Sequence, residues 1–249
     1  MIPKIIHYCW FGRNPKSGMI NECIQSWKNH LPDYEIVEWN EDNFDINSNL
    51  YVKQAYENKK WAFVSDYVRL WALYNFGGIY FDTDVQCLKS MDPFLKDHAF
   101  TGYESNDRPV TAVMGCEKGN LVFKYLLDYY KNVSFITDDG KFNTTTNTVI
   151  ISQMLSRYGF IANGKKGCVR GMVIYPQIYF CPNNFSRIFG IPSKKSYTIH
   201  HFDQSWKNEK TNQTTFVARI RRYIVGKMRN VLGTNRSVKV YTKIKEFIK

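Results

Sequence analysis

The chain has 249 residues, 44% of them hydrophobic, and a formal net charge of +12, which is typical of one globular domain with a full core. No run of residues approaches the roughly 18 apolar positions of a membrane span, and residues 1–12 lack the charged start and cleavage site of a signal peptide. We therefore expect a cytoplasmic protein. Its six cysteines show no paired spacing and are expected to be reduced thiols.

Hydrophobic periodicity predicts strands that alternate with helices. In chain order, the expected elements are a strand at 2–10, a helix at 20–29, a strand at 34–39, helices at 50–57 and 61–76, strands at 79–81, 99–104 and 111–114, helices at 121–130 and 146–158, and strands near 173 and 197. This alternation predicts an α/β layered fold, with one catalytic domain at 1–206 and a separate tail at 207–249.

The best-marked helix, at 61–76, carries two charged residues on one face. Asp66 and Arg69 are three positions apart, so their side chains project together, and Ser65 lies four positions before Arg69. Two glycines then end the helix, as helix caps usually do. A surface ion pair on an amphipathic helix is the alternative interpretation of Asp66 and Arg69.

Two further carboxylates follow directly, where the strand at 79–81 runs into Asp82 and Asp84. Ligands of open α/β sheets bind beyond the carboxyl ends of strands, so we expect these acids to converge with Asp66 and Arg69 on one crevice. Oxygen ligands suit a divalent cation such as Mn²⁺ or Mg²⁺, which keeps positions open for phosphates. A solvated turn is the alternative.

Three ordered blocks of the sequence resemble the DXD sugar-transferase group, which includes glycosyltransferase family 32 and bacterial capsule and lipopolysaccharide glycosyltransferases. The most specific block is WAFVSDYVRLWALYNFGGIYFDTDV at 61–85. IPKIIHYCWFG at 2–12 is similar to the family's first strand, and SYTIHHFDQSW at 196–206 to its closing H-x-x-x-S-W element. The match is thin between 104 and 176.

The resemblance implies a GT-A fold and a retaining hexosyltransferase with a nucleotide-sugar donor. By position, Asp82 and Asp84 would bind the metal and Asp66 and Arg69 the donor. His201 is the expected third ligand, because it begins H-F-x-x-S-W, although His200 next to it also fits and an extended segment points only one of the two at the ion. The other implied donor contacts are His7, Trp10, Gly12, Ser65, Tyr80, Thr83, Ser205 and Trp206. A stacking role for Trp10 favours a UDP-sugar.

The basic charge belongs to the tail. Residues 207–249 contain twelve Lys and Arg and two acids, which accounts for +10 of the net charge and leaves the body nearly neutral. Arginines flank an apolar helical stripe in this segment, a pattern that suits an anionic membrane surface, where each basic side chain contributes about 1 kcal/mol. A solvated C-terminal helix is the alternative.

These features together predict transfer of a hexose from a nucleotide sugar to a glycan or lipid-linked glycan acceptor, in capsule or lipopolysaccharide synthesis at the inner face of the plasma membrane. One alternative is a catalytically inactive relative that binds nucleotide sugars. A second is a nucleic-acid-binding protein, although the nearly neutral body shows no known module, so we expect no nucleic-acid partner. A phosphatase with a strand and D-x-D would have Thr or Val at the position of Gln86.

Overall fold

The computed structural model describes residues 1–105, 108–182 and 193–202. A seven-stranded sheet of order β2-β1-β3-β6-β5-β8-β7 lies at its centre. These strands are β1 (Ile5–Cys9), β2 (Glu35–Trp39), β3 (Gly78–Phe81), β5 (Ala99–Ser105), β6 (Arg108–Cys116), β7 (Gly167–Val169) and β8 (Met172–Tyr175). β1 pairs in parallel with β2 and β3, and β5 with β8, while the remaining pairs are antiparallel. The predicted α/β class is confirmed.

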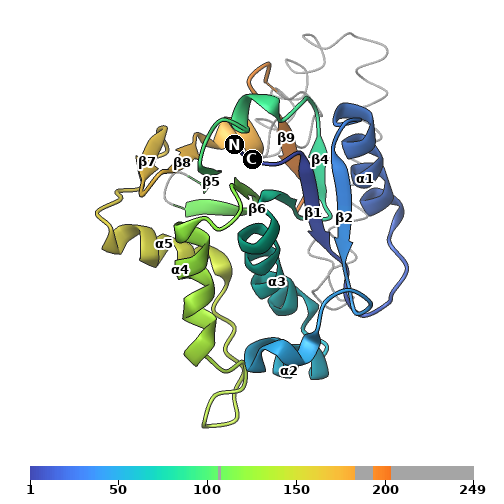
Figure 1. Ribbon diagram of the computed structural model, residues 1–249, viewed down its shortest axis with the longest axis vertical. Helices are drawn as coiled ribbons and strands as arrows, with labels where there is room; N and C mark the ends of the chain where they lie inside the picture. The colour runs from blue at the N-terminus through green and yellow to red at the C-terminus, as the bar shows by residue number, and fades with distance from the viewer. Residues whose placement is uncertain (106–107, 183–192, 203–249) are drawn as a thin grey trace, which may run out of the picture.

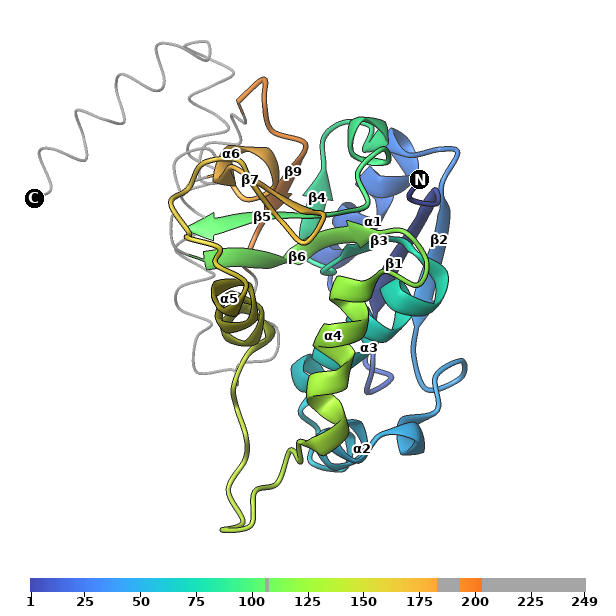
Figure 2. The same ribbon diagram turned by 60° about the vertical axis from the view of Figure 1, so that its left-hand side comes forward.

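Helices cover both faces of this sheet (Figures 1 and 2). One face is covered by α3 (Trp61–Phe76), α4 (Leu121–Tyr129) and α5 (Asn147–Arg157), with α2 (Leu50–Glu57) packed against α3. The other face is covered by α1 (Gly18–His30) and α6 (Gln177–Phe180), and short 3₁₀ turns lie at Ile46–Ser48, Asp92–Phe94 and Tyr130–Asn132. Two apolar cores result, one around Val64 and Phe123 and the other around Trp27 and Phe180. Burial of these faces supplies the main driving force for folding.

A second, two-stranded sheet joins distant parts of the chain. β4 (Val85–Cys87) pairs in antiparallel register with β9 (Thr198–His200), and Val85 lies opposite His200. The indole Nε1–H of Trp27 on α1 donates to the carbonyl oxygen of Val85 at 2.6 Å. The short loop between β3 and β4 therefore connects the large sheet to the small one. The β4–β9 pairing brings His200, from much later in the sequence, next to the end of this loop.

The predicted helices at 50–57 and 61–76 are confirmed with those bounds. The glycine pair has the expected role, because Gly77 and Gly78 adopt φ of 70° and 98°, and Gly77 N–H donates to Leu73 O at 2.9 Å. A Cβ on Gly77 would lie 2.7 Å from the backbone nitrogen of Lys118, so both conformation and packing require glycine. β4, β7 and α6 were not predicted.

In the part of the chain that the structure describes, every helix is too short or too polar to cross a bilayer. The six cysteines lie in the described residues and form no disulfide there, which agrees with the expected thiols. The predicted tail at 207–249, its amphipathic stripe and the domain boundary at 206 lie outside the described residues.

Candidate metal and donor site

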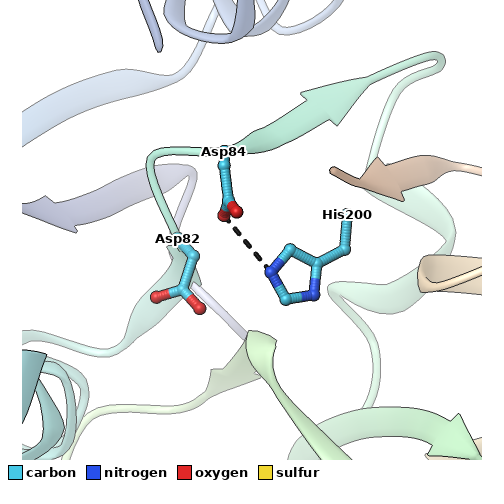
Figure 3. A group of neighbouring side chains, drawn as sticks. All are labelled: Asp82, Asp84 and His200. Atoms are coloured by element: carbon cyan, nitrogen blue, oxygen red, sulfur yellow. Dashed lines mark ion pairs between the residues drawn. The ribbon is translucent and has the colours of Figure 1, made fainter. Parts of the chain in front are cut away.

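Two carboxylates and one imidazole meet at the junction of the two sheets (Figure 3). Asp82 and Asp84 lie in the loop between β3 and β4, and their side chains are 25% and 14% exposed. Asp84 Oδ1 lies 3.2 Å from His200 Nε2, and one ligand atom from each of the three residues lies within 4.8 Å of the others. The predicted closeness of the two acids is confirmed, and they face a histidine.

The chemistry of this cluster fits a divalent cation. Burial lowers the pKa of His200, but its hydrogen bond to Asp84 and the charge of Asp82 outweigh burial and raise the pKa to about 10. The two carboxylates therefore strongly favour a positive charge at this point. Two carboxylate oxygens and one imidazole nitrogen are ligands that a transition ion such as Mn²⁺ accepts. Within the described residues, the hydrogen bond and ion pair of Asp82 both use Oδ1, which leaves Oδ2 available there as a ligand atom.

The structure revises the choice between the two histidines. His201 Nε2 lies 3.1 Å from Gln86 Oε1, and the backbone N–H of His201 donates to Asp84 O at 3.0 Å. The register of β4 and β9 points His200 at Asp84, and side chains alternate along an extended strand, so His201 does not join the cluster. The expected third ligand is corrected from His201 to His200, while metal binding itself stays a prediction.

A buried guanidinium connects the loop to α3. Arg69 is 5% exposed, and its Nη1 lies 3.1 Å from Asp82 Oδ1 while Nη2 lies 3.2 Å from Asp66 Oδ1. Its Nε–H donates to Ser65 O at 3.1 Å, and its guanidinium carbon lies 4.6 Å from the ring centre of Tyr80. Asp66, Arg69 and Asp82 therefore meet as predicted, in one buried ion-pair network and not as a surface pair, while the crevice expected around them and Asp84 stays a prediction.

Asp66 is 8% exposed, and both of its carboxylate oxygens have partners. Oδ1 pairs with Arg69, and Oδ2 accepts the backbone N–H of Asn147 at 3.3 Å. Burial raises the pKa of Asp66 to about 6, although the charge of Arg69 lowers it. Sequence reasoning missed Asn147 as a partner of Asp66. An asparagine at the start of a helix is typical of a simple helix cap, so its position gave no sign of this contact.

His7 is corrected from a donor contact to a structural residue. It is 1% exposed, its Nδ1 accepts the Nε1–H of Trp39 at 3.1 Å, and its Nε2 lies 2.7 Å from Gly77 O. A carbonyl oxygen only accepts, so Nε2 carries the proton. Burial lowers the pKa of His7 to about 4, and the ring is neutral at pH 7. His7 thus holds the turn between α3 and β3.

Tyr80 is corrected in the same way. It is 2% exposed, and its hydroxyl donates to Asp82 Oδ1 at 3.0 Å. Its ring lies under the guanidinium of Arg69. Because ring and hydroxyl are both enclosed, Tyr80 orients the Asp82 carboxylate and has no surface left for the donor.

The first block of the resemblance contributes Trp10 and Gly12. Gly12 has φ of 90°, a Cβ there would lie 2.6 Å from the ring of Trp61, and its N–H donates to Glu41 at 2.6 Å, so packing accounts for the glycine. Trp10 is partly exposed, and its Nε1–H donates to Asn14 O at 2.6 Å. Stacking of a base on Trp10 stays a prediction.

The remaining donor contacts also stay predictions. Ser65 is partly buried, and its Oγ donates to Trp61 O at 3.1 Å. Thr83 lies between the two acids of the loop and is partly exposed. Ser205 and Trp206 lie outside the described residues.

A family match covers the two acids of this site. Residues 18–101, about a third of the chain, match the model of the glycosyltransferase sugar-binding region containing DXD motif. We call residues 18–101 the DXD region. This region includes α3, β3, Asp82 and Asp84, while His200 lies beyond it.

Two curated proteins that are similar to this chain come from yeasts. Inositol phosphoceramide mannosyltransferase 3 of Schizosaccharomyces pombe is 32% identical over 139 residues, which cover 53% of this chain and 37% of the relative. Mannosyl phosphorylinositol ceramide synthase CSH1 of Saccharomyces cerevisiae is 29% identical over 202 residues, which cover 74% of this chain and 50% of the relative. The chain therefore spans half or less of the length of these relatives.

Similar solved structures include two glycosyltransferases. The PaToxG glycosyltransferase has a TM-score of 0.48 and 18% identity and covers 63% of this chain and 69% of its own. The galactosyltransferase LgtC, solved with donor and acceptor sugar analogs, has a TM-score of 0.47 and 12% identity and covers 90% of this chain and 95% of its own. Both likenesses are weak.

Proposed function

We propose that this chain is a metal-dependent glycosyltransferase that takes a hexose from a nucleotide-sugar donor. The observation that supports this proposal best is the cluster of Asp82, Asp84 and His200, which is linked through Asp82 to the buried Arg69. The DXD region contains three of these four residues. A divalent cation at this cluster would supply positive charge to the diphosphate that leaves the sugar.

The residues around the cluster have distinct tasks in this proposal. Departure of the sugar builds negative charge on the leaving phosphate, and fixed positive groups stabilise that charge best when they need no reorganisation. Arg69 is fixed by Asp66, Asp82 and Ser65, so it keeps the loop carboxylate in one orientation. Asp66, which pairs with Arg69, is the group proposed to bind the hydroxyls of the donor sugar.

We expect transfer with retention, by attack of the acceptor hydroxyl on the face that the leaving phosphate occupies. Among the described residues, Asp66 is a buried carboxylate linked to the cluster through Arg69, and it has one oxygen on Arg69 and the other on Asn147 N–H. A carboxylate bound in this way is a poor covalent nucleophile, because whichever oxygen attacks must first give up its ion pair or its hydrogen bond. Mass spectrometry that finds a glycosyl adduct on an Asp or Glu would overturn this expectation.

The donor and acceptor are proposed at the level of chemical class. The donor is a UDP- or GDP-linked hexose. One curated relative is named a mannosyltransferase and the other a mannosyl phosphorylinositol ceramide synthase, which adds mannose to the candidates. The acceptor is a glycan or a lipid-linked glycan of a surface polysaccharide, and the names of both relatives contain a ceramide lipid. Such an acceptor would be reached from the cytoplasm at the inner membrane face.

The test is release of nucleoside diphosphate from a panel of UDP- and GDP-linked hexoses by the purified full chain. We expect hydrolysis of at least one donor with Mn²⁺, loss of activity with excess EDTA, and recovery when Mn²⁺ is restored. Binding of a donor without turnover would instead indicate the inactive relative. Failure to bind any donor would contradict the proposed function.

A further inference from the structure

The start of α5 depends on a carboxylate from another helix. Asn147 is the first residue of α5 and is 1% exposed. Within the described residues, the side chain of Thr146, which precedes it, makes no capping hydrogen bond. The backbone N–H of Asn147 donates instead to Asp66 Oδ2 on α3 at 3.3 Å. A carboxylate at a helix N-terminus is stabilising, so α5 and Asp66 hold each other in place.

The side chain of Asn147 adds a second link to the same residue. Its Nδ2 donates to the backbone oxygen of Asp66 at 2.7 Å. A carbonyl oxygen accepts and never donates, so this contact fixes which end of the amide faces Asp66. The other end, Oδ1, accepts the hydroxyl hydrogen of Tyr130 at 2.9 Å. Tyr130 is 1% exposed, so this hydrogen bond is shielded from water.

These contacts form one continuous path into the site. It runs from the Tyr130 hydroxyl through Asn147 to Asp66, and from Asp66 through Arg69 to Asp82. Buried polar networks of this kind hold a unique geometry only while every member is satisfied. Displacement of the Asn147 amide would therefore change the direction of the Asp66 carboxylate. Asn147 and Tyr130 are both buried, so they would act on Asp66 without contacting the donor themselves.

We propose that Asn147, with its amide oriented by Tyr130, is a positioning residue for Asp66 in glycosyl transfer. This inference rests on the proposed function. Charged and titratable groups near Asp66 are Arg69 on its own helix, Asp82 beyond β3, and the phenols of Tyr51 and Tyr130. The neutral Asn147 amide is the group that connects this set to α5.

The fold supplies a matched control for Tyr130. Tyr51 on α2 is also 1% exposed, and its ring centre lies 4.9 Å from that of Tyr130. Among the described residues, the Tyr51 hydroxyl has no hydrogen-bond partner. Tyr130→Phe and Tyr51→Phe therefore remove the same oxygen from neighbouring buried rings, and only the first change breaks the path to Asp66.

The experiment measures kcat and KM for the hydrolysed nucleotide sugar, together with the thermal unfolding midpoint, in the wild type and both variants. We expect Tyr130→Phe to lower kcat by about five-fold, the effect of one lost buried hydrogen bond, with a smaller change in KM. Tyr51→Phe should leave both constants unchanged. Equal kcat values in the two folded variants would overturn the inference.

A double-variant comparison separates positioning from general packing. In an Asn147→Ala background, Tyr130→Phe should cause no further loss of kcat, because its hydroxyl acts through the amide. Independent losses that multiply would overturn the inference. If Asn147→Ala does not fold, the comparison of Tyr130→Phe with Tyr51→Phe decides alone. An inactive but folded wild type would contradict the proposed function and not this inference in particular.

Discussion

Replacement of both Asp82 and Asp84 by asparagine is expected to lower metal-dependent turnover of the nucleotide sugar by roughly 10²–10³-fold, the usual effect of removing preorganised charge stabilisation. Asparagine keeps the size of each side chain and an acceptor oxygen, so the Tyr80 hydroxyl and Arg69 can still contact position 82. The double variant loses two negative charges where a cation is proposed to bind. Its fold should survive because the loop packs through β3 and β4.

The measurement is the rate of nucleoside diphosphate release at saturating Mn²⁺, with circular dichroism to confirm folding. Asp33→Asn is a suitable control, because Asp33 is an exposed carboxylate paired with Lys4. The control should match the wild type. Undiminished turnover by the Asp82→Asn, Asp84→Asn variant would contradict the assignment of the site.

Replacement of Arg69 by methionine is expected to have the largest effect on stability. Arg69 is 5% exposed and contacts Asp66 and Asp82 together. Burial lowers the pKa of Arg69, but Asp82, Tyr80 and Asp66 outweigh burial and raise it, so the residue is always charged. Its removal leaves Asp66 as an uncompensated buried carboxylate, a change that typically costs about 3–5 kcal/mol of unfolding free energy. Activity should be lost as well, because the loop carboxylate loses its anchor.

Urea denaturation at neutral pH checks this expectation, and a second variant tests its cause. Arg69→Met combined with Asp66→Asn removes the uncompensated charge, so the double variant should regain part of the lost stability. Arg69→Lys should not restore activity, since one ammonium cannot reproduce the two-pronged contact. A stability of Arg69→Met close to that of the wild type would contradict the buried network.

Local sequence patterns predict the part of the site that one continuous segment builds. α3 has the expected bounds, because its apolar spacing and the glycine pair are both local signals. Asp66 and Arg69 are three residues apart on that helix, and Asp82 follows the next strand, so helical and strand geometry alone bring them together. Their burial as a network also agrees with this geometry.

Contacts between distant segments were beyond these signals. The choice of His200 over His201 depends on the register of two three-residue strands, β4 and β9, and a shift by one residue would reverse it. The interior position of His7 depends on Trp39, which lies on a neighbouring strand. The role of Asn147 depends on how α5 packs against α3, and no local pattern encodes that contact.

The most direct test of the metal-diphosphate site is a Mn²⁺ titration monitored by electron paramagnetic resonance. It is carried out in the presence of UDP or GDP on the wild type, His200→Ala and His201→Ala. These neighbouring histidines are a matched pair, because one faces Asp84 and the other contacts Gln86. The structure predicts that His200→Ala weakens Mn²⁺ affinity by about ten-fold or more, as loss of a metal contact does, while His201→Ala binds like the wild type. Weaker binding in His201→Ala alone, or no Mn²⁺ binding by the wild type, would contradict it.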